Sequence, residues 1–267
     1  MTAGDSAIQA EITEMVAEEM QARIVKEPSN WWRVGEAADL YVKHYNAIKN
    51  RRAANAILSP LGLTHESFIT NQSSMDSSLV NDLAKELLNF ELPSVSAIFA
   101  GTDPTGTHIY AIYDNETNCV DNVGFAAIGI GSRHATSQFM FARHAWNSPF
   151  ADTLLLTYYA KRKAEVAPGV GAGTDMVTVG PGLGTFLQIG DQVIEKLERQ
   201  YNNITQSERQ SFSQATGEIR TYVEELAKES AAAQASSDKK QAAPETSNGA
   251  PPAPDARTRE SAEGETR

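Results

Sequence analysis

The hydrophobic positions at the start of the chain recur every three or four residues. Between residues 8 and 24 this spacing predicts an amphipathic helix, with Asp5 as a capping candidate and Pro28 as its end. A second helical pattern runs through residues 34–48 and could extend towards Leu58, where Pro60 stops it because proline cannot continue a helix. The chain is therefore predicted to open with two adjacent long helices.

A connection and a third helix follow. Residues 59–74 contain a proline, a glycine and several serines, and this composition predicts an irregular segment. Asp76 or Ser77 is placed to cap the next helix, whose apolar residues include Leu83 and Phe90.

The hydrophobic period changes after Pro93. Short runs rich in β-forming residues are separated by turn-forming clusters, and residues 101–106 have the strongest turn chemistry of the chain. The runs cover residues 95–100, 108–114, 118–120 and 124–130. An antiparallel meander is the simplest assembly of these runs.

Two more helices are predicted over residues 132–146 and 149–166. Ser132 is expected to cap the first, and Ser148, which precedes a proline, has the position of an N-cap for the second. Residues 175–179 then alternate between apolar and polar as a strand does.

The C-terminal part is predicted to be helical before it becomes a tail. A glycine-rich break at residues 180–184 precedes a long region with apolar residues on one side. Thr205 and Glu208 have the spacing of a capping box, which predicts a separate helix that ends near Lys228. From residue 230 onwards almost no large apolar residue occurs, so a disordered tail is predicted.

The composition narrows the classes of function. The formal net charge is −11, and 18 basic residues face 28 acidic ones before residue 230. This balance argues against a nucleic-acid partner, because phosphate binding needs clustered Lys and Arg. A single cysteine, Cys119, cannot form an intrachain disulfide, and residues 1–30 lack the order of a signal peptide. With no apolar run near the ~20 residues that cross a bilayer, we expect a cytoplasmic protein without a membrane partner.

Some polar residues could form a metal site or a catalytic site, but surface placement or helix capping explains them more simply. His134 and His144 could ligate a metal, yet no Cys or carboxylate cluster accompanies them, which favours surface or groove histidines. Ser132, His134 and Asp152 have the residue types of a serine-hydrolase triad, but the serine lacks a nucleophile-elbow context. Helix capping by Ser132 is the better explanation.

A glycine-rich segment, a pair of tryptophans and the single cysteine could each be functional, but each also has a simple structural explanation. Residues 169–173 superficially match a dinucleotide-binding loop, but the flanking strand and helix of that motif are missing, so a flexible turn is favoured. Trp31 and Trp32 indicate either a partner-facing surface or the packing of an interhelical corner. Cys119 falls on a predicted strand without a paired base and is expected to be inert.

Several local motifs, taken in their order and spacing, resemble those of a known protein family, although no single motif would be sufficient. Ala3-Gly4-Asp5 matches a motif in which a strand ends and a capped helix begins. The other matching runs are 97–103 with 106, 108–113, 125–132 with 135, 152–164 and 174–179. Together they resemble a proteasome-type subunit of the N-terminal-nucleophile hydrolase superfamily over residues 1–180, with an unusual insertion at 58–75.

The resemblance implies an α+β fold of four layers, αββα, in which two stacked antiparallel sheets lie between helices. It also implies a threonine peptidase whose nucleophile and supporting lysine lie on strands before the Ala-Gly-Asp motif. We expect such strands to come from upstream coding sequence or from another polypeptide, because the sheets would otherwise have unpaired edges. Thr2 is expected at the mouth of the first helix, which does not suit a nucleophile.

Two downstream positions depart from the active pattern of this family. Ile130 stands between two glycines where catalytic subunits have Gly-Ser-Gly, and residues 167–171 read Ala-Pro-Gly-Val-Gly near the family's Asp-x-x-Ser-Gly motif. We therefore assign no catalytic, cofactor-binding or metal-ligating residue and expect no cofactor. The family is enzymatic, but the nucleophile and its supporting residues are not found in this chain, which leaves enzymatic activity undecided.

These observations predict three parts. Residues 1–180 form a partial proteasome-like domain, residues 181–229 a C-terminal helical extension, and residues 230–267 a tail. The predicted function is that of a proteasome-like subunit associated with intracellular protein degradation and not catalytic as the chain stands. The alternative is a noncatalytic scaffold or a helical protein-interaction module. We expect partners to be identical or related chains in a ring-type oligomer, together with a complementary chain or an unfoldase.

Overall fold

The computed structural model describes the chain from Met1 to Gln241, and residues 242–267, the end of the predicted tail, lie outside the described residues. The described chain divides into two units, one from Met1 to Ile204 and one that begins at Thr205. Within the described residues, all strands belong to the first unit.

A four-stranded antiparallel sheet forms the centre of the first unit. Its strands span Thr2–Gly4 (β1), Val95–Asp103 (β2), Gly106–Tyr113 (β3) and Glu116–Cys119 (β4). They follow the order β1-β2-β3-β4, so the predicted meander is confirmed for β2 to β4, and β1 joins it at the edge. In the β2–β3 hairpin, Ala97 lies opposite Ile112.

Helices α1 (Ser6–Lys26) and α2 (Val34–Ala53) cover one face of this sheet, as the amphipathic patterns predicted. Asp5 caps α1, because its carboxylate accepts hydrogen bonds from the N–H groups of Ala7 and Ile8. Alternate residues of β2 and β3 point towards these helices, since successive side chains of a strand face opposite sides. The buried core contains Ile8, Ile12, Tyr41, Ile48, Val95, Ala97 and Ile112.

The connection after α2 is more ordered than predicted. A π-helical turn (Ala54–Leu58) and a short 3-10 turn (Ser59–Leu61) lead into helix α3 (His65–Asn71). Thr64 and Ser67 form the capping box of α3, a signal that the prediction of an irregular segment had not used. Helix α4 (Ser77–Asn89) follows, capped by Asp76 as predicted. A separate small core holds this part together through Leu58, Phe68 and Leu83.

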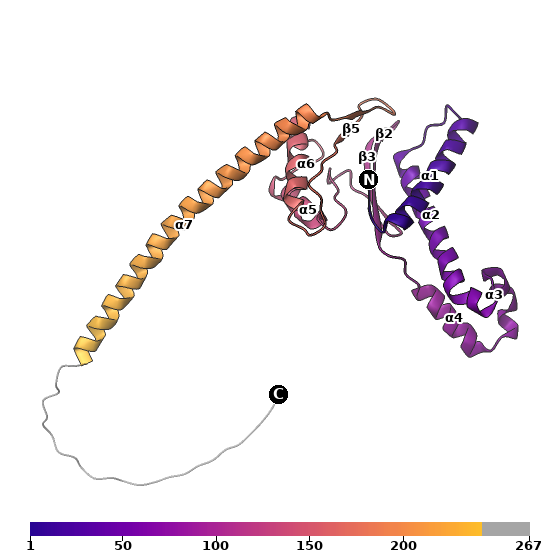
Figure 1. Ribbon diagram of the computed structural model, residues 1–267, viewed down its shortest axis with the longest axis horizontal. Helices are drawn as coiled ribbons and strands as arrows, with labels where there is room; N and C mark the ends of the chain where they lie inside the picture. Colours follow the sequence, from indigo (N-terminus) through magenta and orange to yellow (C-terminus); the bar gives the residue numbers. More distant parts are fainter. Residues whose placement is uncertain (242–267) are drawn as a thin grey trace, which may run out of the picture. The chain divides into compact units, whose positions relative to one another are not determined.

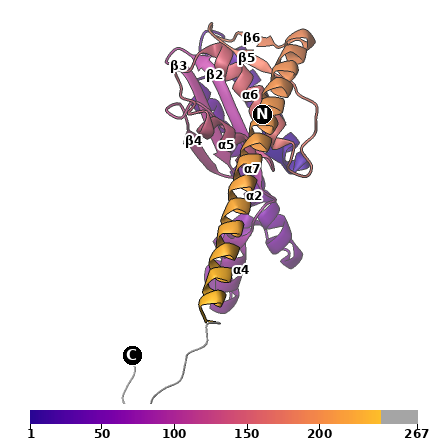
Figure 2. The same cartoon turned by 90° about the vertical axis from the view of Figure 1, so that its left-hand side faces the viewer.

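Helices α5 (Ser132–Phe141) and α6 (Phe150–Ala164) lie on the other side of the sheet, which therefore stands between two helical layers (Figure 1 and Figure 2). The prediction that Ser132 caps α5 was wrong, because Gly131 occupies the N-cap and no side chain bonds the first turn.

The prediction for Ser148 was also wrong. Pro149 is the N-cap of α6, and the Ser148 hydroxyl instead accepts a hydrogen bond from the N–H group of Ala145 in the turn between α5 and α6. The serine stabilises the turn rather than the helix start.

The run at residues 124–130, predicted to be a strand, forms no strand. It passes along α5 as a segment without regular secondary structure between Gly124 and Gly129, which both have positive φ. A strand needs a neighbour for its backbone groups, and within the described residues this run has none. The described residues of the first unit thus have mixed α and β structure, with the four-stranded sheet between two helical layers and a separate two-stranded sheet within residues 177–188.

The C-terminal part begins with a hairpin of β5 (Val177–Val179) and β6 (Phe186–Gln188) and continues in one helix, α7 (Asp191–Gln241). The capping-box prediction at Thr205 was wrong, because the helix continues through it without a break. Residues 230–241 also belong to α7, where disorder was predicted. Alanine, the best helix former, is frequent there.

Candidate binding groove

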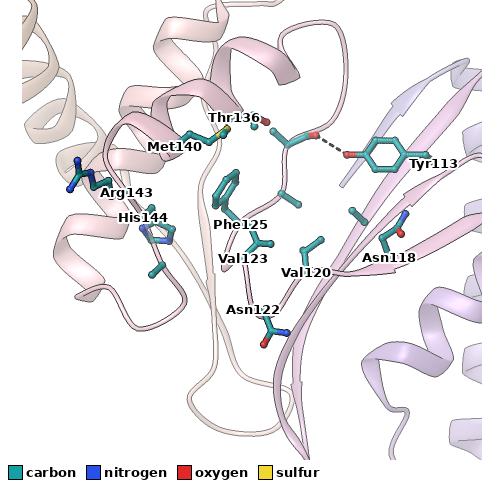
Figure 3. Close-up of a pocket in the computed structure, with 14 residues that line it drawn as sticks. Tyr113, Asn118, Val120, Asn122, Val123, Phe125, Thr136, Met140, Arg143 and His144 are labelled. Atoms are coloured by element: carbon teal, nitrogen blue, oxygen red, sulfur yellow. Dashed lines mark hydrogen bonds between the residues drawn. The ribbon is translucent and has the colours of Figure 1, made fainter.

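An open cavity of about 730 Å³ lies between the sheet and α5 (Figure 3). We call it the groove. Figure 3 shows Tyr113 of β3 and Asn118 of β4 on one side, Thr136 and Met140 of α5 on the other, and Phe125 between them. Most of the lining is apolar, so the groove suits a hydrophobic occupant rather than an ion.

The sheet side of the groove follows from the alternation of β3. Ile112 is 0% exposed in the core under α2, whereas the neighbouring Ala111 and Tyr113 point to the opposite face and line the groove. Tyr113 remains 46% exposed, and its hydroxyl donates a hydrogen bond to the carbonyl oxygen of Ala127 at 3.3 Å. This face of the sheet is therefore only partly covered.

Aromatic stacking fixes the other wall. The ring of Phe125 stacks on Phe139 of α5 with 4.6 Å between centroids, and His144 meets Phe139 edge-on at 5.4 Å. His144 thus belongs to an aromatic cluster at the groove, in agreement with the interpretation as a groove histidine. The cluster attaches the segment 125–128 to α5.

The backbone of residues 125–128 is left largely without partners. Within the described part of the chain, none of its four N–H groups donates a hydrogen bond, and only the Ala127 carbonyl accepts one. All four residues are half-buried. Buried backbone groups in folded proteins are nearly always paired, so this segment is an exception that needs an explanation.

The groove lies in a basic section of an acidic chain. No Asp or Glu occurs between Asp121 and Asp152, whereas Arg133 and Arg143 both do. Neither guanidinium has an ion-pair or hydrogen-bond partner among the described side chains. This groove was not predicted from the sequence, although the absence of acidic residues between Asp121 and Asp152 is visible there.

A second cluster of polar residues lies at the β2–β3 turn. His108 Nδ1 is 2.7 Å from Asp121 Oδ2, and His108 Nε2 is 2.8 Å from Thr105 Oγ1. These distances match the order carboxylate, imidazole, hydroxyl that nucleophilic catalysis uses. Sequence reasoning did not single this cluster out as a site.

The hydrogen bond of the Thr105 hydroxyl argues against a catalytic role for this residue. The hydroxyl donates to Asp103 Oδ1 at 2.5 Å, so its proton is directed to this carboxylate and not to His108 Nε2, 2.8 Å away. Hydrogen bonds from the Thr105 hydroxyl and from the N–H groups of Val34 and Thr105, helped by His108, lower the pKa of Asp103 to about 2 against the cost of burial, which makes it a weak base. The cluster stabilises the turn.

The sequence candidates for nucleophilic chemistry are not brought together. Thr2 lies on the edge strand β1 and is exposed, which places it just before the mouth of α1. Ser132 is the first residue of α5, His134 is exposed in the same turn, and Asp152 is exposed in the first turn of α6. No hydrogen bond or ion pair joins these last three residues within the described chain.

The glycine-rich loop at residues 169–173 has the wrong polarity for a phosphate. Lys161 Nζ donates to the carbonyl oxygens of Gly171 and Ala172 at 3.0 and 2.9 Å. A phosphate-binding loop aims N–H groups at its ligand, whereas this loop aims carbonyl groups at an ammonium. The interpretation as a turn is favoured.

The two tryptophans have different environments. Trp32 packs against the core, donates to the Met20 carbonyl at 3.3 Å and carries the Arg23 guanidinium over its ring at 4.1 Å. Trp31 is exposed and lines a smaller cavity of about 360 Å³ beside Phe186. Cys119 is exposed and free on β4. Among the described residues no group of three or more His, Cys, Asp or Glu could hold a metal, and none of the described helices has the length and apolarity of a membrane span.

No protein-family model and no curated protein matches the chain. The similar solved structures include one at low sequence identity. It is described as "Anbu (ancestral beta-subunit) from Yersinia bercovieri", with 13% sequence identity and a TM-score of 0.47, over 78% of this chain and 76% of that chain.

Proposed function

We propose that this chain is a noncatalytic subunit of a proteasome-type assembly that takes part in intracellular protein degradation. The ordered motifs of the sequence support the family, and two of them fall on the expected elements. Ala3-Gly4-Asp5 ends β1 and caps α1, and residues 97–113 form the β2–β3 hairpin. We assign the four-layer αββα arrangement to the assembled protein, and the cytoplasm as its location.

The observation that carries the noncatalytic role is Ile130. It occupies the turn before α5, where the resemblance places a serine in catalytic subunits, and its side chain is 74% exposed. A hydrocarbon side chain can neither donate nor accept a proton, so it cannot support a nucleophile there.

Exposed apolar residues at the corner between α5 and α6 support assembly. Phe141 is 82% exposed, and Met140, Trp146 and Phe150 are exposed beside it in the sequence. Large apolar side chains gathered at one place mark a protein–protein contact more often than chance. The partners that fit this proposal are identical or related chains in a ring, with a complementary chain or an unfoldase as a further component.

Size-exclusion chromatography with light scattering on the full chain tests the assembly. We expect an oligomer that Phe141→Glu dissociates, because the new charge would be buried at the contact. Leu88→Glu on α4 is the matched control, since Leu88 is also 82% exposed but lies elsewhere. A monomeric wild-type chain would overturn the assembly, and turnover of fluorogenic peptides by the pure chain would overturn the noncatalytic role.

One observation favours a second candidate, a helical protein-interaction module. In the second unit, α7 carries exposed apolar residues at Phe212, Ile219, Tyr222, Val223 and Leu226. The spacing of Phe212, Ile219 and Leu226 is seven residues, which places them on one face of the helix as in a coiled coil. This stripe is independent of the family resemblance.

Point variants in the full chain separate the two candidates. Ile219→Lys should abolish association if the stripe makes the contact, whereas Phe141→Glu should leave association unchanged. The reverse result supports the proteasome-type proposal. Ser213→Lys, on another face of the same helix, controls for added charge.

A further inference from the structure

The segment 125–128 combines two properties that seldom occur together. Its residues are half-buried, and its four N–H groups have no hydrogen-bond partner in the described part of the chain. Backbone N–H groups of folded proteins are generally paired, so another backbone that pairs with these four would stabilise the segment. The neighbouring groove has the room that an added strand needs, about 730 Å³.

The unpaired backbone distinguishes between kinds of occupant. A helix satisfies its own backbone groups internally and would leave the segment 125–128 as it is. An extended chain offers N–H and C=O groups along its edge and can pair with the segment, as in strand addition to an exposed edge. Its alternate side chains would then enter the apolar space beside Ala111 and Met140.

The charges at the groove indicate the sign of the occupant. Arg143 lines the groove, and Arg133 is exposed on the first turn of α5; neither has an ion-pair partner among the described residues. Arg143 also has a positive φ of 52°, an uncommon conformation for a residue other than glycine. Both guanidinium groups are free to pair with carboxylates, as bidentate Arg–carboxylate contacts require.

We propose that the groove binds an extended, acidic segment of a partner polypeptide as an added β-strand along residues 125–128. The partner's alternate apolar side chains fill the groove, and its carboxylates pair with Arg143, which lines it. This inference rests on the proposed function as a subunit of an assembly, and it specifies that the partner contributes an extended, acidic segment. Binding is measured on the chain alone, so a negative result here leaves the oligomer test above unaffected.

The test uses a fluorescein-labelled peptide, Glu-Glu-Val-Thr-Val-Thr-Val-Thr, and fluorescence anisotropy with the full chain. The control peptide is identical but N-methylated at alternate residues, so it keeps the side chains and charges and loses backbone donors along one edge. We expect saturable binding of the first peptide that is at least about tenfold tighter than binding of the second, as for one or two lost hydrogen bonds. Equal binding of both peptides, or none, would overturn the proposal.

Two further measurements locate the contact. Hydrogen–deuterium exchange of the amides of residues 125–128 should slow when the unmethylated peptide binds; protection confined to other residues contradicts strand addition there. Arg143→Glu should weaken binding about fivefold or more through like-charge repulsion. Lys85→Glu, an exposed lysine on α4, should leave it unchanged. Equal weakening by both substitutions would show that binding depends only on nonspecific charge attraction and would contradict the proposed site.

Discussion

Tyr41 donates its hydroxyl hydrogen to Oε1 of Gln9 at 2.8 Å, inside the core between α1 and α2. The amide nitrogen of the same Gln9 donates to the carbonyl oxygens of Ala3 and Ser96 at 2.8 and 3.1 Å. One buried side chain therefore connects β1, β2 and both helices. Burial raises the pKa of Tyr41 to about 12, so its hydroxyl remains a donor at every ordinary pH.

A double-mutant cycle on this pair should show strong coupling. Tyr41→Phe leaves Gln9 Oε1 buried without a donor and should lower the free energy of unfolding by about 1–2 kcal/mol. Gln9→Leu removes three hydrogen bonds and should cost about 3 kcal/mol. Urea denaturation of both single variants and the double variant measures the coupling. Strictly additive losses would contradict the connection.

Gly4 should tolerate no side chain. Its φ is 111°, and an added Cβ would lie 2.2 Å from the carbonyl oxygen of Ser94. Gly4→Ala is therefore expected to cost more than about 2 kcal/mol in thermal or urea unfolding. Gly171→Ala is the matched control, because an added Cβ there meets nothing within 4 Å, and it should change stability by less than about 0.5 kcal/mol. Equal effects would refute the steric argument.

Asp103 should make stability depend on acid pH. Its pKa lies at about 2 when folded, below the ordinary 3.8, because of hydrogen bonds from the Thr105 hydroxyl and from the N–H groups of Val34 and Thr105. The stabilisation is complete above pH 3.8 and is lost as the pH falls towards 2. Asp103→Asn should thus destabilise the chain clearly at pH 6 and much less at pH 2.

Urea titrations of wild type and Asp103→Asn at several pH values give this comparison directly. Asp39→Asn, an exposed carboxylate on α2, serves as the control and should stay close to wild type throughout. A gap between wild type and Asp103→Asn that stays constant from pH 6 to pH 2 would disagree with the lowered pKa.

The Asp121–His108–Thr105 cluster should show no hydrolytic activity. Wild type and Thr105→Val are expected to hydrolyse an activated ester such as p-nitrophenyl acetate at the same background rate, because the threonine proton is directed to Asp103 rather than to His108. Thr105→Val should nevertheless lower stability by about 1 kcal/mol, since Asp103 loses a donor. Esterase activity lost in the variant would restore the catalytic interpretation.

Local signals predicted the elements that depend on local chemistry. Asp5 and Asp76 cap the helices they were expected to cap, and the turn at residues 101–106 closes the hairpin. These features depend on residues within a few positions of one another, which a single sequence displays. Gln9, a polar residue in a buried position, gave no such signal, because its three partners come from three other elements.

The groove was not predictable for a related reason. Residues 124–130 have the composition of a strand, but a strand also requires a partner, and pairing between distant segments is not visible in local composition. The aromatic contact between Phe125 and Phe139 and the turn at Arg143 likewise depend on how α5 lies against the preceding segment. The charge of this section was the only part of the site that the sequence displayed.

The position of Arg133 and Arg143 in an otherwise acidic chain has a kinetic consequence. The screening length for charges is ~8 Å at 0.15 M salt and ~30 Å at 0.01 M salt. At the lower salt concentration the surrounding carboxylates therefore also repel an acidic ligand. Near physiological ionic strength the arginines therefore still attract an acidic ligand at short range. The repulsion between this ligand and the more distant carboxylates of the protein is screened by salt. Association should consequently be fastest at intermediate ionic strength, between general repulsion in dilute buffer and complete screening in concentrated salt.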